Sequence, residues 1–394
     1  MNPLLKLYEY GQSYWLDNLT RGMIRSGELK RRVNEEGLRG VTSNPAIFHK
    51  AITGSEDYDG QIKELVAVGR SLQEIYEELT VTDIRGACDV LRSVYKESDG
   101  IDGYVSLEVS PHLAHETEST KEEARRLFKA VDRPNLLIKI PGTPAAVPAI
   151  EEMLYEGINV NITLLFSVQS YEAVAEAYLK ALERRAVEGR SVRDLASVAS
   201  FFLSRIDVLT DELLKERSEV GAESDQGLRP EELVGKFAVA NAKLAYQSFK
   251  QMMASDRWQS LVKLGARVQR LLWASTSTKN PNYRDVYYVE PLIGADTVNT
   301  MPNETIAAFA DHGRIVPNSV ESGLEEARQI PADLRTVGVD PDSVTEQLLT
   351  EGVQKFIDPF DKLIHALEEK RAKFLGDELN GQSATLRKAD TGVG

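Results

Sequence analysis

The fold is most evident in two segments, NLLIKIPGT over residues 135–143 and GINVNITLLFS over residues 157–167. Each contains a nearly continuous run of apolar residues, which is typical of a strand buried on both faces of a parallel sheet. Segments with helical character lie beside them, at residues 121–130 (KEEARRLFKA) and 171–186 (YEAVAEAYLKALERRA), and the second has apolar residues at a helical period. Strands that alternate with helices predict a parallel sheet surrounded by helices.

The same alternation occurs eight times along the chain. Eight strand–helix units predict an α/β protein with a closed (β/α)₈ TIM barrel. We therefore expect a single domain over residues 1–394. The expected strands are Trp15–Asp17, Gly40–Thr42, Tyr104–Glu108, Leu136–Ile140, Val160–Leu164, Ser197–Phe202, Leu271–Ser275 and Thr297–Met301.

Additional helices are expected outside the barrel, at three places. They are residues 1–14 at the N-terminus, residues 206–256 between strands six and seven, and the C-terminal segment after residue 342. Pro359 should kink the C-terminal helix, because proline lacks the backbone donor and clashes with the preceding turn. The tail, residues 380–394, is polar and poor in apolar residues, so we expect it to be disordered.

Composition restricts the class of partner. The chain has 47 Lys and Arg against 61 Asp and Glu, a net charge of −14, which argues against nucleic acid and anionic membranes as partners. An anionic substrate would need a local basic pocket. The one cysteine, Cys88, is expected in the core, and a single cysteine suits the reducing cytoplasm. The N-terminal segment lacks the apolar run of a signal peptide, and no segment approaches the ~20 apolar residues of a membrane span.

Lys139 is the most informative polar residue, because it lies inside the apolar run LLIKI. A lysine in a strand buried on both faces is costly unless it is paired or lies at a wet strand end. Pro141 and Gly142 follow at once, so Lys139 lies near the carboxyl end of its strand. In barrels this end carries the active site. The residues alone leave two readings open, a functional amine and a lysine directed to solvent.

Other polar residues recur at the same end of successive strands. Ser106 and Glu108 are two residues apart and share one face of their strand, as do Asn161 and Thr163. A lysine among carboxylates suggests amine catalysis, in which an uncharged amine attacks a ketone and the resulting imine accepts electrons. Further candidates at strand ends are Asp17, Asn44, Ser200 and Arg205.

Five motifs together resemble the transaldolase family: LRGVTSNPAIF (38–48), YVSLEVSP (104–111), NLLIKIPGT, GINVNITLLFS and DTVNTMP (296–302). The similarity covers about residues 15–310, and the length and added helices resemble the longer bacterial subfamily. It implies a transferase that reversibly moves dihydroxyacetone from sedoheptulose 7-phosphate to glyceraldehyde 3-phosphate. The products are erythrose 4-phosphate and fructose 6-phosphate, in the non-oxidative pentose phosphate pathway. No metal or organic cofactor is implied, and we expect a monomer or homodimer.

The resemblance also implies a role for each matching residue. Lys139 would form the Schiff base, and Asp17 would be the acid/base at the C4 hydroxyl of the sugar. Glu108 and Thr163 would hold a catalytic water. The implied substrate-binding residues are Asn44, Ser106, Asn161 and Ser200 for the hydroxyls and Arg205 for the phosphate.

Two local features refine this expectation. Phe202 stands where transaldolases have Phe and the related fructose-6-phosphate aldolases have Tyr, which favours transfer over free aldol cleavage. After the seventh strand, many transaldolases continue Ala-Ser-Phe-Arg with the arginine on phosphate. Here residues 274–279 read ASTSTK, so Ser275, Ser277 or Lys279 would have to bind the phosphate instead.

Three alternatives stay open. The first is an aldolase similar to fructose-6-phosphate aldolase, with the same lysine chemistry. The second is a barrel that binds sugar phosphates without catalysis, and the third is a metal- or flavin-dependent barrel. His112, His115 and Glu116 form an H-x-x-H-E sequence, but a metal site would need more ligands in a defined geometry, so no metal is expected.

Overall fold

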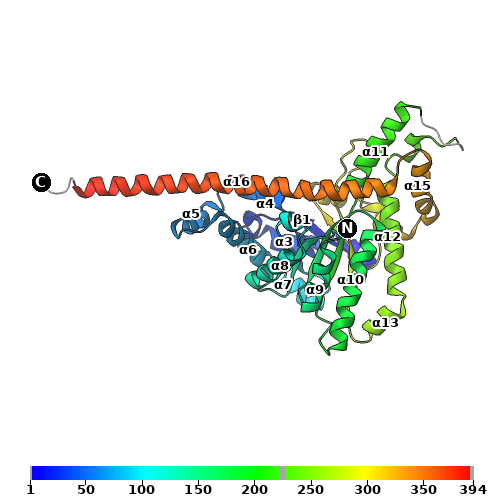
Figure 1. The fold of residues 1–394 in the computed structure, drawn as a ribbon, viewed down its shortest axis with the longest axis horizontal. Coiled ribbons are helices and arrows are strands. Elements are labelled where there is room, and N and C mark those ends of the chain that lie inside the picture. The colour runs from blue at the N-terminus through cyan, green and yellow to red at the C-terminus, as the bar shows by residue number, and fades with distance from the viewer. Residues whose placement is uncertain (1, 222–226, 391–394) are drawn as a thin grey trace.

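The computed structural model describes residues 2–221 and 227–390, with side chains described to residue 376. Eight parallel strands form a closed barrel in the order β1 to β8, and helices surround it, which confirms the predicted fold class (Figure 1). The predicted strands match the observed ones to within a residue or two, except that β1 begins three residues earlier. The strands are β1 Gln12–Asp17, β2 Gly40–Thr42, β3 Tyr104–Glu108, β4 Leu136–Pro141, β5 Val160–Leu165, β6 Ser197–Phe202, β7 Arg270–Ala274 and β8 Thr297–Met301.

The helices lie outside the barrel, and the longer ones bury one face against the strands or against one another. None of those in the described part of the chain is both long and apolar enough to cross a membrane. Their bounds are α1 Pro3–Leu7, η1 Tyr8–Tyr10, α2 Arg21–Arg25, α3 Glu28–Glu36, α4 Pro45–Thr53, α5 Asp59–Ala67, α6 Leu72–Val90, α7 Arg92–Glu97, η2 Pro111–Leu113, α8 Thr117–Val131, α9 Val147–Glu156, α10 Val168–Val187, α11 Ser204–Glu219, η3 Pro230–Leu233, α12 Phe237–Met253, α13 Asp256–Val262, η4 Glu290–Leu292, α14 Asn303–His312, η5 Ser319–Glu321, α15 Leu324–Thr336 and α16 Pro341–Asp390.

The lead-in segment corrects one prediction. The predicted N-terminal helix is present but shorter than residues 1–14, because α1 and η1 end at Tyr10 and β1 begins at Gln12. Gly11 has φ 77°, and a Cβ added there would lie 2.8 Å from the Cα of Ala295. The chain therefore turns sharply at Gly11, and no single helix can run through it. The extra helices expected between strands six and seven are present as α11, α12 and α13.

The C-terminal helix α16 is 50 residues long and crosses one side of the molecule (Figure 1). Its first part packs against α11 and the end of β5, and it then contacts α4, α5 and α6. Pro359 lies inside the helix, which continues without interruption on both sides of it. The backbone stays helical to Asp390, so the predicted tail begins within this helix. The disorder of that tail stays a prediction, and residues 391–394 lie outside the described residues.

A buried ion-pair network closes the amino end of the barrel. The Asp102 carboxylate accepts hydrogen bonds from Arg270 (3.0 Å), Arg39 (3.0 Å) and Ser13 (2.7 Å). Arg270 also donates to the carbonyl of Thr297 at the start of β8. Arg270 thereby links the starts of β7 and β8 to Asp102, just before β3, at this end of the barrel. The open end is the carboxyl end of the strands.

Candidate active site

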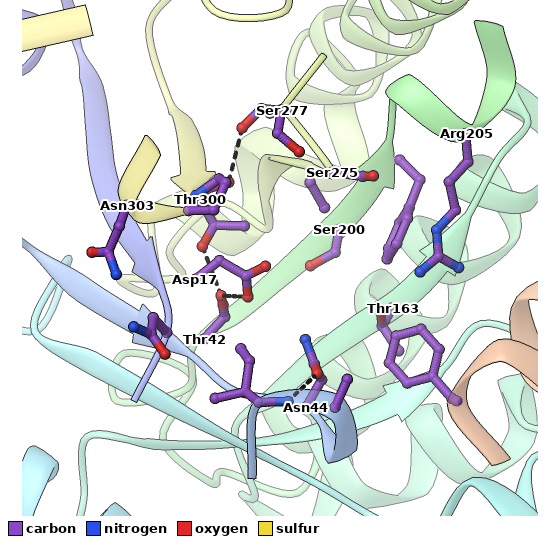
Figure 2. A pocket seen from close by; sticks show the side chains of 18 of the residues that line it. Asp17, Thr42, Asn44, Thr163, Ser200, Arg205, Ser275, Ser277, Thr300 and Asn303 are labelled. Atoms are coloured by element: carbon purple, nitrogen blue, oxygen red, sulfur yellow. Dashed lines mark hydrogen bonds between the residues drawn. The ribbon is translucent and has the colours of Figure 1, made fainter. Parts of the chain in front are cut away.

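A cavity of about 520 Å³ lies at the carboxyl end of the barrel (Figure 2). Figure 2 shows Asn303 and Arg205 at opposite sides of this cavity, with Asp17 and Ser200 between them. Ligand sites in barrels form at this end, where the ends of several strands converge. Nine of the twelve predicted site residues line the cavity: Asp17, Asn44, Lys139, Thr163, Ser200, Phe202, Arg205, Ser275 and Lys279.

Lys139 lies on β4 with only 5% of its surface exposed, and its amine is held by two acceptors. Its Nζ donates to Glu108 Oε2 at 3.1 Å and to the backbone carbonyl of Ser43 at 3.3 Å. Glu108 is the neighbour of Lys139 in the β3–β4 register, so the parallel sheet itself brings the two side chains together. Lys139 lies near the carboxyl end of β4, as its place before Pro141 and Gly142 predicted, and it is buried and not directed to solvent.

Glu108 is a buried carboxyl with one oxygen still available. Burial raises its pKa to about 7, while the charge and hydrogen bond of Lys139 act in the opposite direction. Its Oε1 atom is buried and has no partner among the described residues. A carboxyl of this pKa can both take and give a proton near neutral pH.

Asp17 ends β1 and faces the cavity beside two threonines. Thr42 donates a hydrogen bond to Asp17 Oδ1 at 2.7 Å, and Thr42 and Thr300 share a hydrogen bond of 2.7 Å (Figure 2). Burial raises the pKa of Asp17, and the charge of Lys139 and the Thr42 hydrogen bond lower it in part. The two threonines therefore orient the carboxylate. Sequence reasoning missed both, because a threonine at a strand end is common and carries no signal of its own.

Ser106, Asn161 and Ser200 form a hydrogen-bonded chain across the barrel interior. Asn161 donates to Ser106 Oγ at 2.9 Å, and Ser200 donates to Asn161 Oδ1 at 2.6 Å. Only Ser200 lines the cavity, while Ser106 and Asn161 are fully buried beside it. A substrate role for Ser106 and Asn161 stays a prediction. In the structure they orient Ser200.

Thr163 lies next to an irregularity in β5. The pairing of β5 with β6 shifts register between Ile162 and Leu165, and Leu164 has φ 61°, a conformation that is strained for a leucine. Such bulges change the direction of a side chain at a strand end. The Thr163 hydroxyl is buried and has no partner among the described residues.

Arg205 lies in the first turn of α11, directly after β6, and is held between two aromatic rings. Its guanidinium carbon lies 5.2 Å from the ring centre of Phe202 and 5.6 Å from that of Phe356. Burial lowers the pKa of the guanidinium. Its Nη1 atom is buried without a partner among the described residues. A cation with a free N–H in a cavity is suited to an anionic group.

The segment after β7 forms the wall beside Arg205. Ser275 has φ 56°, and its hydroxyl forms a 2.9 Å hydrogen bond with that of Ser204. Lys279 lies at the rim and donates to Ser277 at 2.8 Å. Residues 274–279 carry no arginine, so Lys279 is the cation that this segment brings to the cavity.

Two carboxylates of α11 accept hydrogen bonds from the later part of the segment that follows β7. Asp207 accepts hydrogen bonds from the Tyr288 hydroxyl (2.9 Å) and from the backbone N–H of Ala238 (2.7 Å). Asp211 accepts from the Tyr283 hydroxyl. Burial raises the pKa of Asp207 to about 7. These contacts join the segment after β7 to the helix that carries Arg205.

Asn44 and His112, which the sequence analysis considered, each form a hydrogen bond in the structure. Asn44 caps α4 by accepting from the backbone N–H of Ile47 at 3.0 Å, and it lines the cavity as well. His112, the first residue of the H-x-x-H-E sequence, contacts Asp361 on α16 at 2.7 Å. Within the described ranges, no group of three or more His, Cys, Asp or Glu side chains could hold a metal ion.

The fold and the site together define a class: a (β/α)₈ barrel with a lysine amine, paired with a carboxyl, at the carboxyl end of its strands. Comparison with known proteins gives the family. Residues 14–367 match the family model described as transaldolase/fructose-6-phosphate aldolase. The chain is 52% identical over 374 residues to "Transaldolase 2" of a Nostoc species and 51% identical over 374 residues to the transaldolase of Trichodesmium erythraeum. Each alignment covers 94% of this chain and 98% of the relative.

A third relative supports the same family. The transaldolase of Frankia alni is 47% identical over 371 residues, which is 94% of this chain and 97% of that protein. Similarity at this level over nearly the whole length is decisive. The chain belongs to the transaldolase/fructose-6-phosphate aldolase family.

Proposed function

We propose that this protein is a transaldolase, a transferase of the non-oxidative pentose phosphate pathway. It reversibly transfers dihydroxyacetone from sedoheptulose 7-phosphate to glyceraldehyde 3-phosphate, giving erythrose 4-phosphate and fructose 6-phosphate. The observation that carries the proposal is the buried amine of Lys139, 3.1 Å from Glu108, in a cavity that Asp17 and Arg205 also line. Close similarity to transaldolases over 94% of the chain supports it.

The reaction begins when the uncharged amine of Lys139 attacks the C2 carbonyl of the ketose. Proton transfers turn the carbinolamine into an imine, with loss of water. Glu108 Oε1 and the Thr163 hydroxyl are both buried and unpartnered among the described residues, and we assign them to a water that relays these protons. Glu108 suits the task because its pKa of about 7 matches a neutral working pH.

Carbon–carbon cleavage follows. Asp17 removes the proton of the C4 hydroxyl, the C3–C4 bond breaks, and the electron pair moves into the imine to give an enamine. An aldose phosphate leaves, and a second aldose phosphate is attacked by the enamine carbon. Asp17 then returns its proton to the new hydroxyl. Water hydrolyses the product imine, which releases the new ketose phosphate and restores the amine of Lys139. The imine accepts the electrons throughout, so we propose no cofactor and no metal.

The substrate has two ends to be recognised. We assign the hydroxyls of the dihydroxyacetone end to Asn44 and Ser200, which line the cavity, with Ser106 and Asn161 supporting Ser200. We assign the phosphate to Arg205, supported by Ser275 and by Lys279 at the rim. These cations provide the local basic pocket that a chain of net charge −14 needs for an anionic substrate.

Other properties follow from the sequence rather than from the site. We propose a cytoplasmic protein of one domain over residues 1–394, acting as a monomer or homodimer without nucleic acid or membrane partners. Cys88, the one cysteine, is buried, as expected for a protein that needs no disulfide.

Trapping with sodium borohydride tests the proposal. Fructose 6-phosphate and borohydride should leave a reduced dihydroxyacetone adduct on the peptide that contains residues 135–141. Lys279→Met, which removes a lysine at the rim of the same cavity, should still give this adduct. An adduct on another lysine, or none in a folded sample, would contradict the assignment of Lys139.

A transfer assay separates the proposal from the alternatives. With fructose 6-phosphate and erythrose 4-phosphate, a transaldolase forms sedoheptulose 7-phosphate. An enzyme similar to fructose-6-phosphate aldolase would instead release free dihydroxyacetone without needing an acceptor. A barrel that only binds sugar phosphates would do neither.

A further inference from the structure

The C-terminal helix α16 places one aromatic side chain in the cavity. Phe356 lines the cavity although its own surface is only 5% exposed. The centre of its ring lies 5.1 Å from Lys139 Nζ and 5.6 Å from the guanidinium carbon of Arg205. A single apolar ring thus contacts both the proposed nucleophile and the proposed phosphate-binding cation.

A glycine one turn earlier lets the helix approach this closely. Gly352 precedes Phe356 by four residues and so lies on the same face of α16. A Cβ added at Gly352 would lie 3.2 Å from Leu164 and 3.3 Å from Phe166, at the end of β5. A larger residue at this position would crowd the side chains of Leu164 and Phe166, so glycine gives this turn of α16 its close contact with the strand ends.

Contacts further along α16 keep the helix against the barrel. The Phe360 ring packs edge to face on Tyr76, with the ring centres 5.2 Å apart, and also contacts the His112 ring at 5.7 Å. Asp361 forms the 2.7 Å hydrogen bond with His112. Phe356 therefore covers Lys139 through a packed helix and not through a free loop.

We propose that Phe356 determines whether the three-carbon unit is transferred or released to water. This inference rests on the proposed transaldolase function. After C3–C4 cleavage the enamine on Lys139 must persist until an acceptor aldehyde arrives. If water reaches it, the enamine carbon takes a proton, water hydrolyses the C2=N bond, and free dihydroxyacetone leaves as the amine is restored. The Phe356 ring restricts further water from reaching the enamine carbon, apart from the one water assigned to Glu108 and Thr163, and closed sites suppress such side reactions.

Phe356→Leu tests this specificity, because it keeps an apolar side chain but removes the ring from over Lys139. The assay supplies fructose 6-phosphate with erythrose 4-phosphate and measures free dihydroxyacetone and sedoheptulose 7-phosphate in the same reaction. We expect the ratio of release to transfer to rise about tenfold or more, the effect of roughly 1.4 kcal/mol between two competing barriers. A release-to-transfer ratio within twofold of wild type would overturn the proposal.

Phe374→Leu is the matched control. Phe374 is also on α16 and also 5% exposed, but it lies eighteen residues further on, ~27 Å along the helix axis. It should keep the wild-type ratio, and an equal rise in both variants would show a general loosening of α16 and refute the role of Phe356. If Phe356→Leu does not fold, Phe356→Met is judged by the same criterion. Failure of wild type to form sedoheptulose 7-phosphate would instead contradict the proposed function.

Discussion

Replacing Lys139 by methionine would leave the carboxyl of Glu108 buried without its cationic partner. The amine and the carboxylate are 3.1 Å apart and almost fully buried. With an effective dielectric constant of about 20, their attraction is at most about 5 kcal/mol. In wild type the lysine lowers the pKa of Glu108 against the larger effect of burial, and the result is about 7. Without the lysine, the pKa of Glu108 should rise well above 7.

The raised pKa of Glu108 also determines in which direction the free energy of unfolding changes with pH. A carboxyl whose pKa is raised on folding stabilises the folded state at low pH and loses that contribution as the pH rises to its folded pKa. In wild type this loss is complete near pH 7, whereas in Lys139→Met it should continue above pH 7. The free energy of unfolding of the variant should therefore fall relative to wild type by ~1.4 kcal/mol per pH unit, nearly 3 kcal/mol between pH 7 and pH 9.

Urea unfolding at several pH values measures this difference. The double variant Lys139→Met/Glu108→Gln is the control, because it has no carboxyl to titrate and should show no extra slope above pH 7. Lys139→Met should also lose activity and borohydride trapping while it stays folded near pH 6. A stability difference from wild type that is constant from pH 7 to pH 9 would refute the argument that Glu108 depends on Lys139.

Three further predictions concern single side chains. Asp17→Asn should still form the borohydride-trapped imine but slow carbon–carbon cleavage by ~10²-fold or more, and unchanged single-turnover cleavage would exclude Asp17 as the base. Arg205→Lys should raise KM for fructose 6-phosphate by about tenfold, because lysine lacks the planar fork of donors that suits a phosphate, and an unchanged KM would contradict the assignment of Arg205. Asp207→Asn removes a carboxyl whose pKa is raised to about 7 by burial, so the stability advantage of wild type over this variant should shrink by up to about 4 kcal/mol from pH 4 to pH 8. Urea unfolding of both proteins at pH 4 and pH 8 checks the last prediction. It would be contradicted if the free energy of unfolding changed equally in wild type and Asp207→Asn between these pH values.

The barrel could be predicted from the sequence because its strands are buried on both faces. Residues such as Leu136–Ile140 have no polar face, so the apolar runs mark the strands directly, and Lys139 is conspicuous among them. The start of β1 was harder to place. Gln12 and Ser13 are polar, and they are buried only because they bond to Thr297 and Asp102, far along the chain.

The site could be predicted only in part, for a related reason. Strand ends meet in a barrel, so the sequence alone indicates that polar residues at those ends, such as Asp17 and Glu108, lie close together. How deeply each side chain is buried could not be predicted, and Glu108, Ser106 and Asn161 lie beside the cavity without lining it. Phe356 gave no signal at all, because an apolar residue on an amphipathic helix normally belongs to the core.

The place of Phe356 in the chain has a consequence for biosynthesis. A ribosome delivers all eight strands, and with them Lys139, Asp17 and Glu108, before it reaches α16. The residues that perform the chemistry are therefore all synthesised before the side chain that covers the amine. Productive exchange between sugars, as opposed to loss of dihydroxyacetone, would depend on the part of the chain that leaves the ribosome last.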